Sequence, residues 1–389
     1  MSTTAERDEA FVAAVRLVAG DVAAVHADEV DRAARFPAET IAALRADGAL
    51  AAAVPEALGG GGVSLPALAA ACFELGRRCG ASGMVFAMHQ IQVLCIARHL
   101  DDAPWFEAYL RTVATDQPLI ASVTSEVTTG GDLGRSTAAV TTAQDASCAF
   151  EKAAPTVSYG GEADDLLTTL RRGPDAEPGD QVVVLTRRDQ TTLEPAGTWD
   201  PMGMRGTCSP GFVVRARFGP EQVLPTPFNR VSAESMVPIS HILWSHVWLG
   251  VATDAFDRAR AFVRAAARRS PDRQPPSAVR LSHLMTELSL LRGEITSALH
   301  AYVASADDRE ALSTLASALR FNNLKVAASQ QAPRVCQAAL EVCGIMGYRN
   351  DTPFSVGRHL RDALSASLMV ANERIHATNA GLLLVAKDV

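Results

Sequence analysis

The feature that most constrains this chain is a change in residue pattern near residues 119 and 224. Between these positions, short runs rich in β-branched and other apolar residues alternate with Gly, Pro, Asp and Asn, as at 181–185 and 211–218. Such runs are typical of strands joined by turns. On both sides of this region, apolar residues recur at helical spacing instead. The pattern predicts a central β-domain between two helical domains.

The C-terminal part of the chain favours a helical bundle. Its periodic stretches are 236–269, 275–305, 309–342 and 353–386. Four such helices with short connections predict an antiparallel four-helix bundle. Their apolar content exceeds what one intramolecular face requires, so we expect the bundle to pack against further copies of the chain.

Together these patterns predict an α+β fold that is mostly α. The expected domains are an N-terminal helical domain over 1–117, a central β-domain over 118–226 and the bundle over 227–389. A chain of 389 residues is long enough for several domains.

Composition excludes several classes of partner. The formal net charge is −7, and no basic block with interleaved aromatic residues opposes it, so nucleic acid is not an expected partner. The most apolar stretch, residues 82–100, is interrupted by His89, Gln90 and Gln92, and we expect a buried core helix there and no membrane segment. The charged N-terminus lacks the apolar core of a signal peptide. The seven cysteines show neither disulfide nor zinc-ligand spacing, so we expect a cytoplasmic protein.

Several motifs narrow the fold further. Residues 343–349 read Cys-Gly-Ile-Met-Gly-Tyr-Arg, and Arg-Asp-Ala follows at 361–363. Residues 203–207 read Gly-Met-Arg-Gly-Thr, and residues 125–132 read Ser-Glu-Val-Thr-Thr-Gly-Gly-Asp. In their order along the chain, these motifs resemble those of the acyl-CoA dehydrogenase family of flavoproteins. The resemblance covers nearly the whole chain.

This resemblance implies a β-barrel-like middle domain and FAD bound between domains and subunits of a homodimer or homotetramer. The residues that it places at FAD are Ser125, Thr128, Gly130, Gly131, Thr156, Ser158, Arg268, Gly344, Gly347 and Asn372. Arg268 would reach the flavin pyrophosphate of a partner subunit. The Phe-Gly pair that follows this arginine in the family is missing here, which predicts a weakened or restructured FAD site.

The sequence departs from the family at the catalytic base. The family's glutamate corresponds to Val370 on the last helix or, in some members, to Ser240 on the first bundle helix. Neither side chain accepts a proton at neutral pH without help. His241, which adjoins Ser240, and His89 are candidate bases, because an imidazole has an unperturbed pKa of about 6.5. The alternative for His89 is a hydrogen-bonded core histidine.

Glu373 is a further candidate base, because it lies three residues after Val370 and would reach the site if the helix were rotated. The alternative is an ion pair between Glu373 and Arg374. Gln92, Val370 and Glu373 are the residues expected to line the substrate pocket.

The resemblance therefore leads us to expect an FAD-dependent oxidoreductase that acts on an acyl thioester of CoA or of a carrier protein. The expected reaction is α,β-dehydrogenation in a specialised or secondary-metabolic pathway, with the electron acceptor left open. One alternative is a flavin-dependent monooxygenase on the same fold, although residues 365–370 lack the histidine of that group. Another is a redox-neutral member that binds its substrate without flavin turnover.

Overall fold

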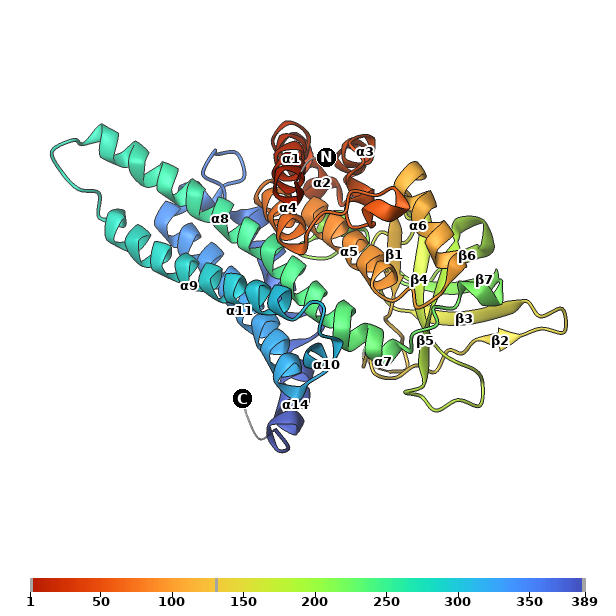
Figure 1. Cartoon of the computed structure of the whole chain (residues 1–389). Coiled ribbons are helices and arrows are strands. Elements are labelled where there is room, and N and C mark those ends of the chain that lie inside the picture. Colours follow the sequence, from red (N-terminus) through yellow and green to blue (C-terminus); the bar gives the residue numbers. More distant parts are fainter. Residues whose placement is uncertain (1–2, 130–131, 387–389) are drawn as a thin grey trace.

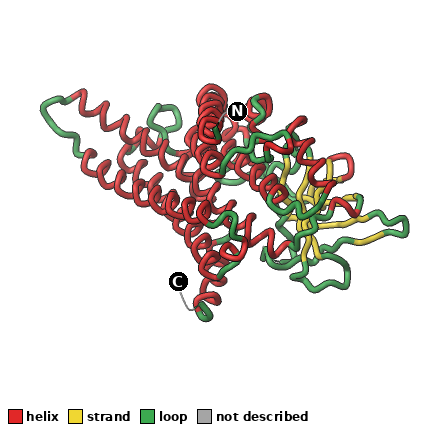
Figure 2. Tube along the Cα trace, in the orientation of Figure 1, coloured by secondary structure: helices red, strands yellow, loops and turns green. Residues whose placement is uncertain are grey.

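The computed structural model describes residues 3–129 and 132–386 and shows helical, β and helical parts in chain order (Figure 1). The strands gather at one end of the molecule, and helices make up the rest (Figure 2). The N-terminal helices are α1 (Thr4–Val18), α2 (Ala24–Ala33), α3 (Ala38–Ala46), α4 (Leu65–Arg78), α5 (Gly80–Ala97) and α6 (Pro104–Asp116). This order confirms the predicted fold class.

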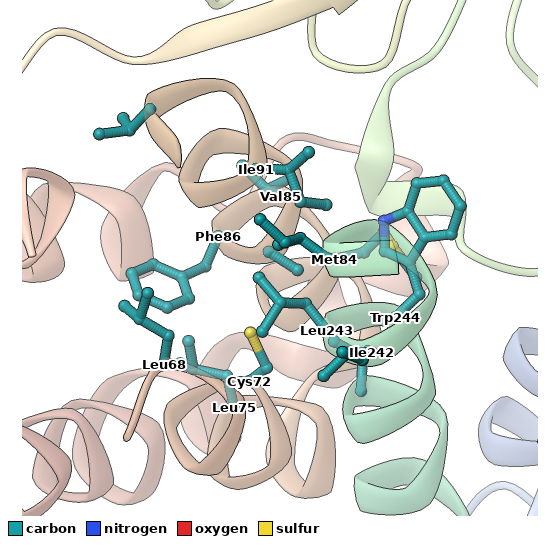
Figure 3. Close-up of a cluster of buried hydrophobic side chains, with 14 of the residues drawn as sticks. Leu68, Cys72, Leu75, Met84, Val85, Phe86, Ile91, Ile242, Leu243 and Trp244 are labelled. Atoms are coloured by element: carbon teal, nitrogen blue, oxygen red, sulfur yellow. The ribbon is translucent and has the colours of Figure 1, made fainter. Parts of the chain in front are cut away.

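The centre of the core lies where α4 and α5 pack against α8 (Val237–Arg269), as Figure 3 shows for Leu68, Phe86 and Leu243. The helices approach closely because glycines stand at the crossing. A Cβ on Gly76 would lie 2.5 Å from the Val247 carbonyl oxygen, a distance that no side chain tolerates. The glycine at position 76 of α4 thereby sets how closely α8 approaches, and α8 carries part of the candidate site.

Two helical stretches are long and apolar enough to cross a membrane when judged by length and composition alone. They are Thr4–Ala33, near the N-terminus and 28% buried, and Gly80–Ala97, which is 83% buried. The second stretch is α5, whose residues are buried on nearly every side. The core helix predicted over 82–100 is therefore confirmed.

The middle domain consists of two sheets, where the sequence suggested one barrel-like unit. Its strands are β1 (Ile120–Val123), β2 (Thr141–Thr142), β3 (Cys148–Ala154), β4 (Asp165–Arg171), β5 (Gln181–Arg187), β6 (Thr191–Pro195) and β7 (Phe212–Phe218). The strand orders are β1-β4-β5 and β2-β3-β7-β6. The β1–β4 pair is parallel, and the other strand pairs within the described residues are antiparallel. The Lys152 ammonium on β3 donates to the Thr169 carbonyl on β4 at 2.7 Å and so ties the two sheets together.

The C-terminal domain follows the bundle prediction for three long helices and departs from it at the end. After α7 (Phe228–Val231), the long helices are α8, α9 (Ser277–Ala304) and α11 (Leu315–Cys343), with α10 (Arg309–Leu312) between the last two. The chain then forms α12 (Ile345–Tyr348), α13 (Gly357–Leu364) and α14 (Asn372–Leu383). The single helix predicted over 353–386 is wrong, because it breaks at 365–371. Val370 has a φ of 50°, which no α-helix allows.

The C-terminal domain is joined to the β-domain by a short-range contact between two of the sequence motifs. The Met204 amide donates to the Asp362 carboxylate at 2.7 Å. A Cβ on Gly203 would lie 2.0 Å from the Arg361 carbonyl oxygen, so only glycine fits there. The turn at 203–207 and the start of the broken C-terminal segment therefore form one unit.

Candidate functional site

The loop after β1 is held by one buried carboxylate. Glu126 accepts hydrogen bonds from the Thr137 and Ala138 amides, both at 2.9 Å, and from the Ser136 hydroxyl at 2.7 Å. Lys152 lies 3.7 Å away. Burial opposes the charge of Glu126, but these hydrogen bonds and the Lys152 ammonium outweigh burial and lower its pKa to about 2. The carboxylate thus fixes both ends of the loop.

The hydroxyl residues predicted to contact a flavin lie around this loop. The Ser125 hydroxyl donates to the Thr156 carbonyl at 2.6 Å, so these two residues lie side by side just beyond the end of β3. The Thr128 hydroxyl donates to Glu126 at 3.2 Å. The Ser158 hydroxyl accepts from Ser209 at 3.0 Å, within the turn that follows the Gly-Met-Arg-Gly-Thr motif. Gly130 and Gly131 lie outside the described residues.

His89 is a core histidine in this structure. Its Nε2 donates to the Leu50 carbonyl at 2.7 Å, and its Nδ1 accepts from the Ile120 amide at 3.1 Å. Burial lowers its pKa to about 4. Because both ring nitrogens are engaged by main chain, His89 ties α5 to β1 and has no nitrogen left for a substrate. His89 is therefore better described as a hydrogen-bonded core histidine, the alternative given above, than as a catalytic base.

His241 lies on the first turns of α8 and is also buried. Its Nδ1 donates to the Phe321 carbonyl on α11 at 2.9 Å. Its Nε2 consequently carries a lone pair, and no partner for it occurs among residues 3–129 and 132–386. Burial, reinforced by the nearby Lys325 charge, lowers the pKa of His241 to about 4. The imidazole is therefore neutral and only weakly basic at neutral pH.

A buried lysine contacts the turn that contains Val370, one of the two positions that correspond to the family's glutamate. The Lys325 ammonium on α11 donates to the Val370 carbonyl at 2.8 Å and to the Asn372 side-chain oxygen at 2.7 Å. The Asn372 amide in turn donates to the Ser329 hydroxyl at 3.0 Å. These bonds hold the Val370 turn, whose positive φ is unfavourable for a β-branched residue. Strain of this kind concentrates at functional sites.

Lys325 has no acidic partner in the described part of the chain, and its side chain has no exposed surface. Burial without a counter-ion lowers its pKa to about 7. Lys325 also lies close enough to His241 to influence its charge. Lys325 therefore contacts the Val370 turn, and its charge contributes to the low pKa of His241, the neighbour of Ser240.

Sequence reasoning missed Lys325, although a signal was present. The chain uses arginine almost throughout and has lysine only at positions 152, 325 and 387. The first two are buried, with 1% and 0% of their surface exposed. A lysine in an arginine-rich chain is therefore a signal for a buried site that suits a compact ammonium better than a planar guanidinium.

The structure leaves the other predicted residues apart from this cluster. The Gln92 side-chain nitrogen donates to the Met88 carbonyl of its own helix at 3.1 Å, and its oxygen is buried without a partner. Glu373 is exposed on the first turn of α14 and forms no ion pair with Arg374 in the part of the chain that is described. Arg268 is exposed at the end of α8, on the hairpin that extends from the body (Figure 1).

The predicted glycines lie at the far end of α11. Gly344 ends this helix with a φ of 58°. Gly347 is buried, and a Cβ there would lie 2.6 Å from the Cys343 Cβ.

The residues present fit a flavin on the β-domain side. Ser125, Thr128 and Ser158 provide hydroxyl groups for the polar edge of a planar ring system, and Glu126 keeps their loop in place. The dinucleotide end fits less well, since no Phe-Gly pair follows Arg268.

Comparison with known families settles the fold family. The N-terminal domain of acyl-CoA dehydrogenase matches residues 5–114, and its C-terminal domain matches residues 235–378. This chain belongs to the acyl-CoA dehydrogenase family. It is therefore a flavoprotein of that fold, in a family of flavin-dependent enzymes.

Individual relatives point in two directions. The chain is 24% identical over 351 residues to the probable acyl-CoA dehydrogenase YngJ of Bacillus subtilis, covering 87% of this chain and 88% of that protein. It is 27% identical over 254 residues to a dibenzothiophene monooxygenase of Mycolicibacterium goodii, covering 62% of this chain and 59% of that protein. Among solved structures, KijD3 in complex with FMN and a dTDP-sugar superposes with a TM-score of 0.83 and 24% identity, covering 98% of this chain and 95% of KijD3. That last likeness concerns the fold alone.

Proposed function

We propose that this chain is a flavin-dependent monooxygenase. The observation that carries the proposal is the lack of a carboxylate at both places where the family hosts its base. Val370 forms a strained turn at one place, and Ser240 stands on α8 at the other. α,β-Dehydrogenation requires a base close to the reacting carbon. Oxygen transfer from reduced flavin does not require a base at either place.

The substitutes for the missing carboxylate are poor bases. His89 has both ring nitrogens bonded to main chain, and His241 has its pKa lowered to about 4 by burial. Glu373 is exposed and not held by a neighbour in the described residues. An exposed, unanchored carboxylate is badly placed for proton abstraction, because the orientation of a base must be fixed before reaction.

The residues that are present suit oxygen chemistry. When bound, a reduced flavin supplies the two electrons with which one atom of O₂ enters the substrate and the other leaves as water. Lys325 holds the Val370 turn, and in its protonated form its ammonium would stabilise negative charge that develops nearby in a low dielectric.

We further propose that the flavin is FMN, delivered in the reduced form by a separate reductase. The missing Phe-Gly pair removes the family's contact to the dinucleotide end of FAD in a partner subunit. KijD3, which shares this fold, has been solved with FMN. FAD, which the resemblance implied, is the alternative to FMN. A homodimer or homotetramer, a cytoplasmic location and a specialised metabolic pathway remain proposals from the sequence. The exposed Leu368 and Tyr348 provide apolar surface for subunit contacts.

The experiment begins with anaerobic mixing. The protein is loaded with FMN or with FAD, oxygen is removed, and a panel of acyl-CoA thioesters is added while the visible flavin absorbance is followed. We expect no bleaching. Bleaching by a thioester would mean that the enzyme dehydrogenates it, and the monooxygenase proposal would then be wrong.

The second part supplies reduced FMN through a reductase under isotopically labelled oxygen. A panel of aromatic, amine and thioester compounds is screened by mass spectrometry for products that carry one labelled atom. A labelled product that depends on the protein is the expected result. Free FMN with the reductase serves as the control, because it releases peroxide without a specific product.

Dehydrogenation of an acyl thioester is the second candidate, favoured by one observation. The Nε2 of His241 has a free lone pair and adjoins the family's alternative base position. If bleaching does occur, His241→Ala should slow it at least tenfold, since one general base contributes about 10²–10⁴-fold. His246→Ala is the matched control, because His246 is an equally buried histidine of α8 that donates to the Ile242 carbonyl of its own helix.

A further inference from the structure

A charged cleft is lined by residues other than those assigned to the flavin above. Its volume is about 530 Å³, and it opens between α2, the turn at 202–205, α8 and the segment 350–361. This volume lies within the roughly 300–1,000 Å³ of small-molecule sites. Five arginines and two aspartates line the cleft. Four of the arginines are ion-paired, Arg205 with Asp200, Arg258 with Asp254, Arg358 with Asp28 and Arg361 with Asp31, and Arg32 is left without an ion pair among the described residues.

The arginines are held by main chain as well as by acids. The Arg258 Nε donates to Asp254 at 2.9 Å and its Nη1 to the Ser355 carbonyl at 3.0 Å. The Arg358 Nε donates to Asp28 at 3.1 Å and its Nη1 to the Arg78 carbonyl at 3.3 Å. In each guanidinium, Nη2 has no protein partner within the described residues. Both guanidinium groups are therefore held in a fixed orientation and retain N–H donors for an anion that accepts two hydrogen bonds.

Two further arginines of the cleft behave differently. Arg361 is fully engaged, because it pairs with Asp31 and donates to the Met202 carbonyl at 2.8 Å. Arg32 is exposed at the edge of the cleft, and no bond or ion pair of its side chain occurs in the described ranges. Arg32 at the rim and the oriented guanidinium groups of Arg258 and Arg358 inside the cleft would together suit an anion larger than chloride.

His359 gives an independent indication of a ligand. Only 3% of its surface is exposed, and it lines the cleft. Its Nε2 donates to the Asp254 carboxylate at 2.7 Å, so its Nδ1 carries the lone pair. This Nδ1 is buried and has no hydrogen-bond partner among residues 3–129 and 132–386. Burial lowers the pKa of His359 to about 4, so the ring stays neutral and keeps this lone pair as an acceptor for a ligand hydroxyl.

We propose that this cleft binds a phosphorylated small molecule through a phosphate or diphosphate group. Phosphate oxygens would take the free guanidinium donors of Arg258 and Arg358, and Arg32 would close on the group from the rim. A hydroxyl on the ligand or on a protonated phosphate donates to His359. The site does not depend on the flavin chemistry proposed above.

Calorimetry of the full chain with inorganic pyrophosphate tests the proposal, at an ionic strength held constant with sodium chloride. We expect saturable binding with one site per chain. Arg32→Glu should weaken it at least tenfold, and this exposed residue can be changed without breaking an internal contact. The matched control is Arg111→Glu, an exposed arginine of α6 outside the cleft. No saturable binding by the unmodified protein, or equal weakening by both variants, would overturn the proposal.

Discussion

Replacing Lys325 by methionine should change the pH dependence of stability. Burial lowers the pKa of Lys325 in the folded chain from 10.5 to about 7. The unfolded chain stays protonated up to about pH 10.4, so between these values it binds more protons than the folded chain. The free energy of unfolding of the unmodified protein therefore rises with pH through this window, and this contribution is absent from Lys325→Met.

The magnitude follows from the two pKa values. Across the whole window between the folded and unfolded pKa values of Lys325, the free energy of unfolding would change by on the order of 5 kcal/mol, at about 1.36 kcal/mol per pKa unit. Over the accessible range from about pH 7 to about pH 9, the unmodified protein should gain about 2 kcal/mol relative to Lys325→Met. A constant loss is superimposed, because the Val370 carbonyl and the Asn372 oxygen lose their donor, at about 1–3 kcal/mol for each buried group.

Urea unfolding of both proteins at the two pH values measures this difference, and other titrating groups cancel because both proteins contain them. Ser329→Ala is the control, since it removes a member of the same cluster without a titrating group. Its effect on stability should be the same at both pH values. If the Lys325→Met difference also stayed constant within about 0.5 kcal/mol, the reasoning about a buried, unpaired ammonium would be refuted.

Three further predictions concern the loop, the core and the reaction. Glu126→Gln should destabilise the protein by about 1–3 kcal/mol near neutral pH, measured by urea unfolding, because it removes a charged acceptor of several buried donors. With a folded pKa of about 2, Glu126 gives stability that is present above the ordinary glutamate pKa and lost as pH falls toward 2, so the difference should shrink in acid. Gly76→Ala should lower the thermal midpoint clearly, since its Cβ would meet the Val247 carbonyl at 2.5 Å, whereas Gly20→Ala, with nothing within 4 Å, should not lower it. Val370→Glu should give measurable anaerobic bleaching of flavin by an acyl-CoA that the isosteric control Val370→Gln does not give, and equal behaviour of the two would mean that this turn does not face the reacting carbon.

The fold could be predicted from the sequence because its residue patterns are periodic and extend over long stretches. Alternating and helical patterns over about a hundred residues each identify the order of the domains, and a buried α5 follows from its apolar surface on all sides. The break before α14 was not accessible. Residues 365–371 contain neither glycine nor proline, and the positive φ of Val370 is imposed by Lys325, which lies on another helix.

For a related reason, the candidate site could be predicted from the sequence only in part. The resemblance assigns Ser125 and Thr156 to the same flavin, and the structure places these two residues in contact. The roles of the histidines depend on main-chain partners far away in sequence, Leu50 and Ile120 for His89. No local pattern contains that information.

The contact between Met204 and Asp362 has a consequence for chimeric proteins built within this family. Because Gly203 packs directly on the Arg361 carbonyl, the β-domain turn and the C-terminal segment match each other atom by atom. A hybrid that takes its C-terminal domain from one relative and its β-domain from another must inherit both motifs as a pair. A single junction in the connection before α7, at residues 224–227, would separate the two motifs, so such a hybrid also needs the turn at 203–207 from the relative that supplies its C-terminal domain.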